Sequence, residues 1–173
     1  MEHKFAAQLY TLREELKEGI RPLFKTLKEM GWAGVQISAL PKDYDQNEVA
    51  LALKENNLQA VGMHISLDRL KDNLNGVLQE ADLYGTKDII LPSVAPELQN
   101  QSGFKEIKQT LNRIAKEAPE YRISYHNHAF EFDIEIDGQE GLRYLLDPSN
   151  ENAILAEIDV YWLKKAGIDP LEY

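Results

Sequence analysis

The sequence contains no cysteine, which excludes disulfide bonds and metal sites built on thiolates. It has no apolar run of roughly 18 residues, the length that a transmembrane helix requires. Residues 1–4 lead into a short apolar run without the core of a signal peptide, so we expect a cytoplasmic protein with no membrane partner. Histidine is also scarce, at 4 residues, and this makes the position of each histidine informative.

Positive charge is in short supply as well. The chain has 19 Lys and Arg against 29 Asp and Glu, which gives a formal net charge of −10. Such a field repels phosphate backbones and anionic lipid, so we expect no nucleic acid partner. The apolar share of 43% and the charged share of 28% are those of an ordinary globular protein. A length of 173 residues fits a single domain spanning 1–173.

Short apolar runs alternate with longer amphipathic segments along the whole chain. The short runs start at intervals of roughly 25–35 residues, which fit a strand, a crossover helix and two loops. The longer segments place apolar residues at helical spacing, as in Ile20, Leu23 and Leu27. The predicted strands cover residues 5–9, 34–38, 59–64, 87–91, 121–128 and 154–159. Predicted helices cover 20–30, 49–58, 67–81, 104–115 and 142–146, and 169–173 is expected to begin another.

Strict alternation of strand and helix predicts a parallel sheet covered by helices, either open and doubly wound or closed as a barrel. No glycine-rich phosphate loop follows the first predicted strand, where a dinucleotide-binding fold would carry one. Polar side chains instead collect at the carboxyl ends of several strands, which is the arrangement of a TIM barrel. Because that barrel has eight strands, we expect an incomplete α/β barrel with about six of its eight βα units.

Residues 125–132, Tyr-His-Asn-His-Ala-Phe-Glu-Phe, concentrate two imidazoles and a carboxylate. If 121–128 is a strand, His126 and His128 share one face, since side chains alternate along a strand. Glu131 follows the strand end, where a loop can turn its carboxylate back over that face. Imidazole and carboxylate together form a ligand set for Mn, Zn, Fe or Co. The stretch therefore predicts a metal site, although His126 is also compatible with a buried core histidine.

Asp159 closes the last predicted strand and offers a further carboxylate. Strand-end carboxylates in a barrel face the site, so we favour a metal ligand over its alternative, a cap of the following helix. Gln8, Gln36 and His64 lie at or near the carboxyl ends of three earlier predicted strands. In mid-strand such residues belong to the core, and at a strand tip they are open to a ligand.

These motifs resemble the sugar phosphate isomerase/epimerase family. Its members have a xylose isomerase-like TIM barrel and are related to endonuclease IV, in AP endonuclease family 2, and to inosose dehydratase. The matching segments are Ala7-Gln8-Leu9-Tyr10-Thr11-Leu12-Arg13, Gly31-Trp32-Ala33-Gly34-Val35-Gln36, Tyr125-His126-Asn127-His128 with Glu131-Phe132, Ala156-Glu157-Ile158-Asp159-Val160-Tyr161-Trp162, and Ala166-Gly167-Ile168-Asp169-Pro170. The resemblance runs along the whole chain and implies a barrel truncated before strands seven and eight.

The resemblance also implies one divalent metal at the carboxyl-end mouth of the barrel, most often Mn, with Zn, Co, Mg and Fe as alternatives. Family ligands come from strands five to eight, and Asp159 falls on the strand-six aspartate. On strand five, either His126 replaces the usual glutamate or Glu131 reaches in from the loop. The strand-seven histidine and strand-eight glutamate have no counterpart in this chain.

The implied activity is isomerisation or epimerisation of a sugar, sugar phosphate or keto-sugar through an enediolate, with a metal polarising the carbonyl. We expect Glu131 and His128 to be catalytic, and His128, His64, Gln8 and Gln36 to contact the sugar. The alternatives are a keto-sugar lyase or dehydratase that uses the same enolate, and an inactive barrel fragment. An endonuclease IV-like phosphodiesterase is disfavoured by the 4 histidines and the charge of −10.

Overall fold

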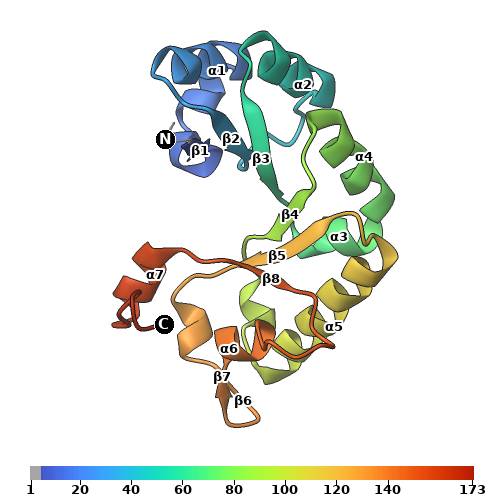
Figure 1. The fold of residues 1–173 in the computed structure, drawn as a ribbon, viewed down its shortest axis with the longest axis vertical. Coiled ribbons are helices and arrows are strands. Elements are labelled where there is room, and N and C mark those ends of the chain that lie inside the picture. Colours follow the sequence, from blue (N-terminus) through green and yellow to red (C-terminus); the bar gives the residue numbers. More distant parts are fainter. Residues whose placement is uncertain (1–4) are drawn as a thin grey trace. The chain divides into compact units, whose positions relative to one another are not determined.

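The computed structural model describes residues 5–173; residues 1–4, which were examined for a signal peptide, lie outside the described part. The chain forms two compact units, which we call the first unit (Met1–Ile65 and Asp72–Ile89) and the second unit (Ser66–Lys71 and Ile90–Tyr173). Parallel strands follow the chain in the sheet order β1-β2-β3-β4-β5-β8, with helices between them (Figure 1). The predicted fold class, an incomplete α/β barrel, is confirmed.

All the predicted strands are present; β3 has the predicted ends, and the other five are shorter than predicted by one to three residues. They are β1 (Ala6–Gln8), β2 (Gly34–Ile37), β3 (Gln59–His64), β4 (Asp88–Leu91), β5 (Arg122–His126) and β8 (Leu155–Glu157). An antiparallel hairpin is formed by β6 (Glu135–Ile136) and β7 (Gln139–Glu140). The helices are α1 (Ile20–Glu29), α2 (Gln46–Glu55), α3 (Leu67–Asp72), α4 (Leu74–Tyr84), α5 (Gln101–Glu117), α6 (Gly141–Leu145) and α7 (Val160–Lys165), with short 3-10 turns at Leu9–Leu12, Glu15–Glu18, Pro96–Leu98 and Phe130–Phe132.

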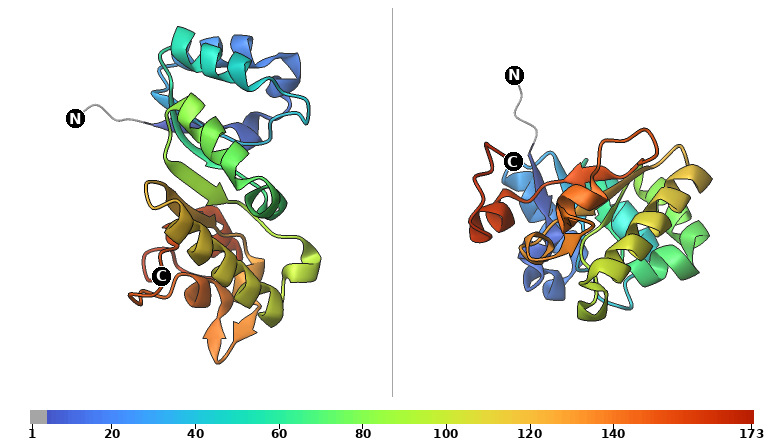
Figure 2. Two further views of the ribbon diagram at one scale, coloured as in Figure 1. Left: turned by 90° about the vertical axis from the view of Figure 1, so that its right-hand side faces the viewer. Right: turned by 90° about the horizontal axis from the view of Figure 1, so that it is seen from below.

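In the first unit, α1 and α2 lie side by side over strands β1, β2 and β3 (Figures 1 and 2). Every residue of β2 is buried, since the strand pairs in parallel with β1 and with β3. A Cβ on Gly34 would lie 2.5 Å from the carbonyl oxygen of Gln59, so the close approach of β2 and β3 requires glycine there. The apolar face of α1, which the sequence predicts, supplies the buried Ile20, Leu23, Phe24 and Leu27.

The helix predicted over 67–81 is wrong as a single element, because the chain breaks it into α3 and α4 at Asn73. The Asn73 side chain accepts a hydrogen bond from the Gly76 N–H at 3.2 Å and so caps the start of α4. Residues 169–173 form a turn rather than the start of a helix, whereas α7 is a helix that the apolar pattern did not indicate. None of the described helices is long and apolar enough to cross a membrane.

In the second unit, α5 packs along β5 through a row of buried apolar residues: Phe104, Ile107, Leu111 and Ile114. Strand β5 pairs in parallel with β8, and the register places Tyr125 opposite Ala156 and His126 opposite Glu157. Because both strands run in the same direction, His126 and Glu157 end them side by side. This register positions the candidate site.

Candidate metal centre

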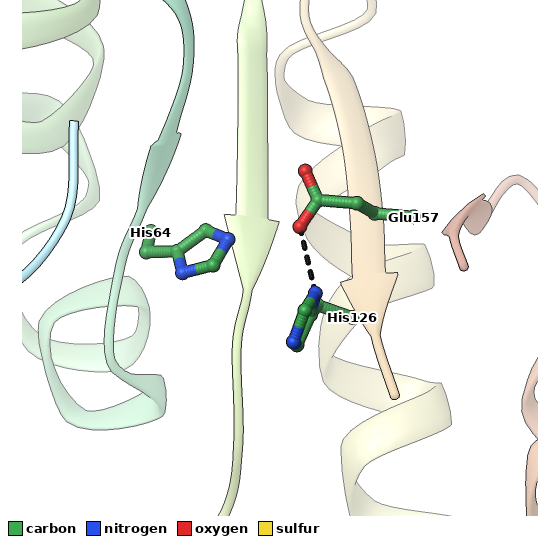
Figure 3. Close-up of side chains that lie close together, drawn as sticks. All are labelled: His64, His126 and Glu157. Atoms are coloured by element: carbon green, nitrogen blue, oxygen red, sulfur yellow. Dashed lines mark hydrogen bonds and ion pairs between the residues drawn. The ribbon is translucent and has the colours of Figure 1, made fainter. Parts of the chain in front are cut away.

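The pair His126–Glu157 is the centre of the candidate site. The Nδ1 atom of His126 lies 2.9 Å from Oε2 of Glu157, as the dashed line in Figure 3 marks. His126 is buried, and the Glu157 side chain keeps 29% of its surface exposed. Glu157 was missed as a site residue, because the sequence places it inside the last predicted strand rather than at its tip. The structure ends that strand at Glu157.

Asp159 lies beyond β8 and begins α7. Its Oδ1 accepts a hydrogen bond from the Tyr161 N–H at 2.9 Å, so the helix-capping alternative is confirmed. Its other oxygen, Oδ2, lies 3.8 Å from Nε2 of His126. One carboxylate thus caps a helix and faces the imidazole at the same time, and the ligand role of Asp159 stays a prediction compatible with this geometry.

His128 lies next to His126, although the predicted reason, alternation along one strand, is wrong. Strand β5 ends at His126, so the two histidines do not alternate along one strand. Their ring centroids are nevertheless 5.2 Å apart, and the His128 ring lies 4.9 Å from that of Trp162. The His128 ring also stacks with the Phe130 ring, at 6.1 Å between centroids. An aromatic wall therefore fixes His128 beside the candidate ligands, and its catalytic and substrate-binding roles stay predictions.

Glu131 is fully buried at the 3-10 turn Phe130–Phe132. Its Oε1 accepts a hydrogen bond from the Tyr125 hydroxyl at 2.8 Å, and its Oε2 accepts one from the His128 N–H at 2.9 Å. Burial raises the pKa of Glu131, and burial next to this carboxylate raises the pKa of Tyr125. Through these two bonds Glu131 holds the Tyr125 hydroxyl and the His128 backbone, and its predicted roles as ligand and base stay predictions.

The remaining candidates belong to the first unit. Gln8 ends β1 and stands opposite Gln36 in the register of β2, and its Nε2 donates to Oε1 of Gln36 at 3.0 Å. The Ser38 hydroxyl accepts a hydrogen bond from the Tyr10 N–H at 2.9 Å and ties the loops that follow the two strands. His64 is the last residue of β3 and is half-buried. Gln8 and His64 end their strands as predicted, Gln36 lies one residue before the end of β2, and the substrate-binding roles stay predictions.

The donor set of the second unit fits a divalent cation. An imidazole nitrogen with carboxylate oxygens suits Mn, Zn, Fe or Co, and its net negative charge favours any dication. Metal–ligand bonds are about 2.1 Å for nitrogen and oxygen donors. A separation of 3.8 Å between Nε2 of His126 and Oδ2 of Asp159 is therefore short enough for both atoms to reach one ion.

No family model and no curated protein sequence matches this chain. Solved structures do match it over most of its length. A sugar phosphate isomerase/epimerase from Parabacteroides distasonis shares 20% identity at a TM-score of 0.77, covering 99% of this chain and 70% of that one. An AP endonuclease, family 2, from Brucella melitensis shares 18% identity at a TM-score of 0.66, covering 91% and 69%. The probable 3-DHS dehydratase involved in petrobactin synthesis in Bacillus anthracis shares 14% identity at a TM-score of 0.63, covering 98% and 68%.

At these identities the similarity establishes the fold. The chain has the fold of sugar phosphate isomerase/epimerase and AP endonuclease family 2 structures, as the resemblance in its motifs implies. Proteins with this fold include one named as an isomerase/epimerase and one named as a dehydratase.

Proposed function

We propose that the chain carries the metal-binding residues of an isomerase or epimerase that acts on a sugar, sugar phosphate or keto-sugar through an enediolate. The observation that carries the proposal is the grouping of His126, Glu157 and Asp159 in the second unit, at separations of 2.9 and 3.8 Å. The fold supports it, since carboxyl ends of parallel strands are where barrel enzymes place their chemistry.

In this proposal His126 and Asp159 hold the ion, with Mn favoured and Zn, Co, Mg and Fe as alternatives. Glu157 accepts the Nδ1–H of His126 and thereby fixes the tautomer that directs Nε2 toward Asp159. When bound, a divalent cation supplies Lewis acidity toward a substrate carbonyl and its adjacent hydroxyl.

Proton movement is assigned to the second unit as well. The His128 imidazole is held beside His126, and imidazole accepts and returns protons near neutral pH. Glu131 contributes by accepting the backbone N–H of His128, which fixes the turn that carries the ring. The amides Gln8 and Gln36, with His64, retain their expected role as partners of sugar hydroxyls.

A second candidate is elimination of water from a keto-sugar, which begins with the same loss of an α-proton. The structural similarity to the 3-DHS dehydratase is the observation that favours keeping it. An endonuclease-like activity is disfavoured, because a net charge of −10 opposes binding of a phosphate backbone.

The test is solvent exchange in D₂O. The protein is incubated with Mn²⁺ and a panel of aldoses, ketoses, their phosphates and keto-sugars, and the products are followed by NMR. Deuterium at the carbon next to the carbonyl, with the carbon skeleton intact, is the result expected of the isomerase or epimerase. Loss of water would select the lyase. No exchange with any sugar, under conditions where Mn²⁺ is shown to be bound, would refute both and support an inactive fragment.

A further inference from the structure

Asn127 stands between His126 and His128 in the sequence, but its side chain forms hydrogen bonds with Asp159, at the start of α7. The residue is fully buried. Its Oδ1 accepts a hydrogen bond from the Asp159 N–H at 2.8 Å, and its Nδ2 donates to the Asp159 carbonyl oxygen at 3.3 Å. The same Nδ2 donates to the carbonyl oxygen of His128 at 3.3 Å. The carboxamide therefore forms hydrogen bonds with both the N–H and the carbonyl oxygen of Asp159.

These hydrogen bonds lie just beyond the end of the pairing between β5 and β8. The ladder between β5 and β8 closes with the pair His126 and Glu157, so no strand pairing places Asp159 relative to β5. A carboxamide carries one acceptor and a donor in a plane, as a peptide group does, and it can therefore replace a strand partner. Asn127 extends the connection between the two segments past the last ladder pair, up to the residue that faces His126.

We propose that Asn127 is a positioning residue that sets the distance between the Asp159 carboxylate and the His126 imidazole, and through it the affinity for a divalent cation. This inference rests on the proposed function, because it concerns the same metal. Few other side chains fill the role: a carboxylate at 127 would accept the Asp159 N–H but would oppose the carbonyl oxygens of Asp159 and His128, and an aliphatic side chain would make none of the bonds.

The chain offers a matched control in Asn152. Its Nδ2 donates to the carbonyl oxygens of Leu145, at the end of α6, and of Asp147, in the following loop, both at 2.8 Å, and its Oδ1 accepts a hydrogen bond from Nδ2 of Asn112 at 2.9 Å. Asn152 thus joins backbone segments by the same chemistry as Asn127, but at the amino end of β8 instead of the carboxyl end. Replacing either residue by leucine removes a comparable set of bonds, and only the Asn127 bonds lie beside the candidate ligands.

The experiment measures Mn²⁺ affinity, by EPR of free Mn²⁺, together with the thermal midpoint of the metal-free protein by circular dichroism. We expect Asn127→Leu to weaken Mn²⁺ binding by about tenfold or more, as losses of partners that orient metal ligands do. We expect Asn152→Leu to lower the thermal midpoint while keeping the wild-type affinity. Asn127→Ser, whose hydroxyl can accept the Asp159 N–H but cannot reach both backbone groups, should give an intermediate affinity and replaces the leucine variant if that one does not fold.

Wild-type affinity in the folded Asn127 variants would overturn the positioning role while leaving the proposed function intact. Equal weakening by Asn152→Leu would also overturn it, because the effect would then be one of general stability. A wild-type protein that binds no Mn²⁺ would refute the proposed function itself and the positioning role with it.

Discussion

The first and the second unit end a pair of parallel strands in the same way but with different chemistry. Gln8, the last residue of β1, stands opposite Gln36, one residue before the end of β2, and His126 stands opposite Glu157 at the tips of β5 and β8. The side chains of each pair contact each other, at 3.0 Å between the amides and 2.9 Å between imidazole and carboxylate. The backbone register is thus equivalent, and the side chains alone decide what each strand end can bind.

The two pairs of side chains differ in the kind of ligand that they can bind. Two carboxamides present donors and acceptors without charge, which suits hydroxyl groups and offers a cation little. An imidazole beside carboxylates supplies the nitrogen and oxygen donors of a transition-metal site. We therefore propose that the first unit contacts sugar hydroxyl groups and that the second unit holds the metal.

We expect the largest effect from removing the negative charge of Glu157, which distinguishes the His126–Glu157 pair from the Gln8–Gln36 pair. Glu157→Gln keeps a group of the same shape next to His126 but no longer supplies a carboxylate to accept the Nδ1–H. We expect Mn²⁺ affinity to fall by about 10–100-fold, the cost typical of losing such a partner. Titration with Mn²⁺ measures this. An affinity within twofold of the wild type would show that Glu157 does not orient the imidazole, and Glu135→Gln, on the β6–β7 hairpin, is the control for loss of one negative charge.

A smaller effect is expected from the amide pair. Gln36→Leu removes the acceptor of the hydrogen bond from Gln8 and leaves the latter amide with one partner fewer. A hydrogen bond contributes about 1 kcal/mol, so we expect KM for a sugar substrate to rise about fivefold with little change in Mn²⁺ affinity. Steady-state kinetics together with the Mn²⁺ titration separate the two quantities. Loss of Mn²⁺ binding in this variant would contradict the proposal that only the second unit holds the metal.

The smallest effect is a pH dependence of stability in the second unit. Burial raises the pKa of Glu131 above its ordinary value of 4.5, so the folded state favours the protonated acid. The contribution of that proton to stability is complete below pH 4.5 and is lost as the pH rises through the raised pKa of the folded state. Glu131→Gln cannot titrate, so relative to the wild type it should gain stability across this window, by at most about 1.4 kcal/mol per pH unit.

Urea unfolding of the metal-free protein at a series of pH values measures that difference. The gain of Glu131→Gln over the wild type should level off once the pH exceeds the raised pKa. A difference that does not change with pH would contradict the assignment of a raised pKa to this carboxyl group.

The sequence predicted the strand tips of the first unit well and those of the second unit less well. Gln8 and Gln36 are placed by the ladder itself, and apolar periodicity reveals where a ladder runs. In the second unit the predicted strands continue to residues 128 and 159, but the ladder stops at His126 and Glu157. Side-chain hydrogen bonds from Asn127 replace it there, and no periodic pattern records such bonds. This is why Glu157 was missed.

A signal for Glu157 was nevertheless present. When the carboxyl ends of the two predicted strands are aligned, position 128 falls opposite 159 and His126 falls opposite Glu157, as in the structure. The break at Asn73 is also absent from the apolar spacing, because it depends on one side chain that caps the start of α4. The hydrogen bonds that Glu131 accepts from Tyr125 and His128 depend on contacts across a turn, and the spacing of residues in the sequence does not predict them.

In the proposed function, the ionisable strand ends of the second unit bind a divalent cation and the amides Gln8 and Gln36 of the first unit do not. The most direct measurement is calorimetric titration of Mn²⁺ into the wild-type protein, Asp159→Asn and Gln8→Leu. Asp159→Asn keeps the oxygen that caps α7, so the helix start is preserved. We expect the wild type and Gln8→Leu to bind one Mn²⁺ with equal affinity, and Asp159→Asn to bind it at least about tenfold more weakly. Unchanged affinity in Asp159→Asn would contradict the proposed function.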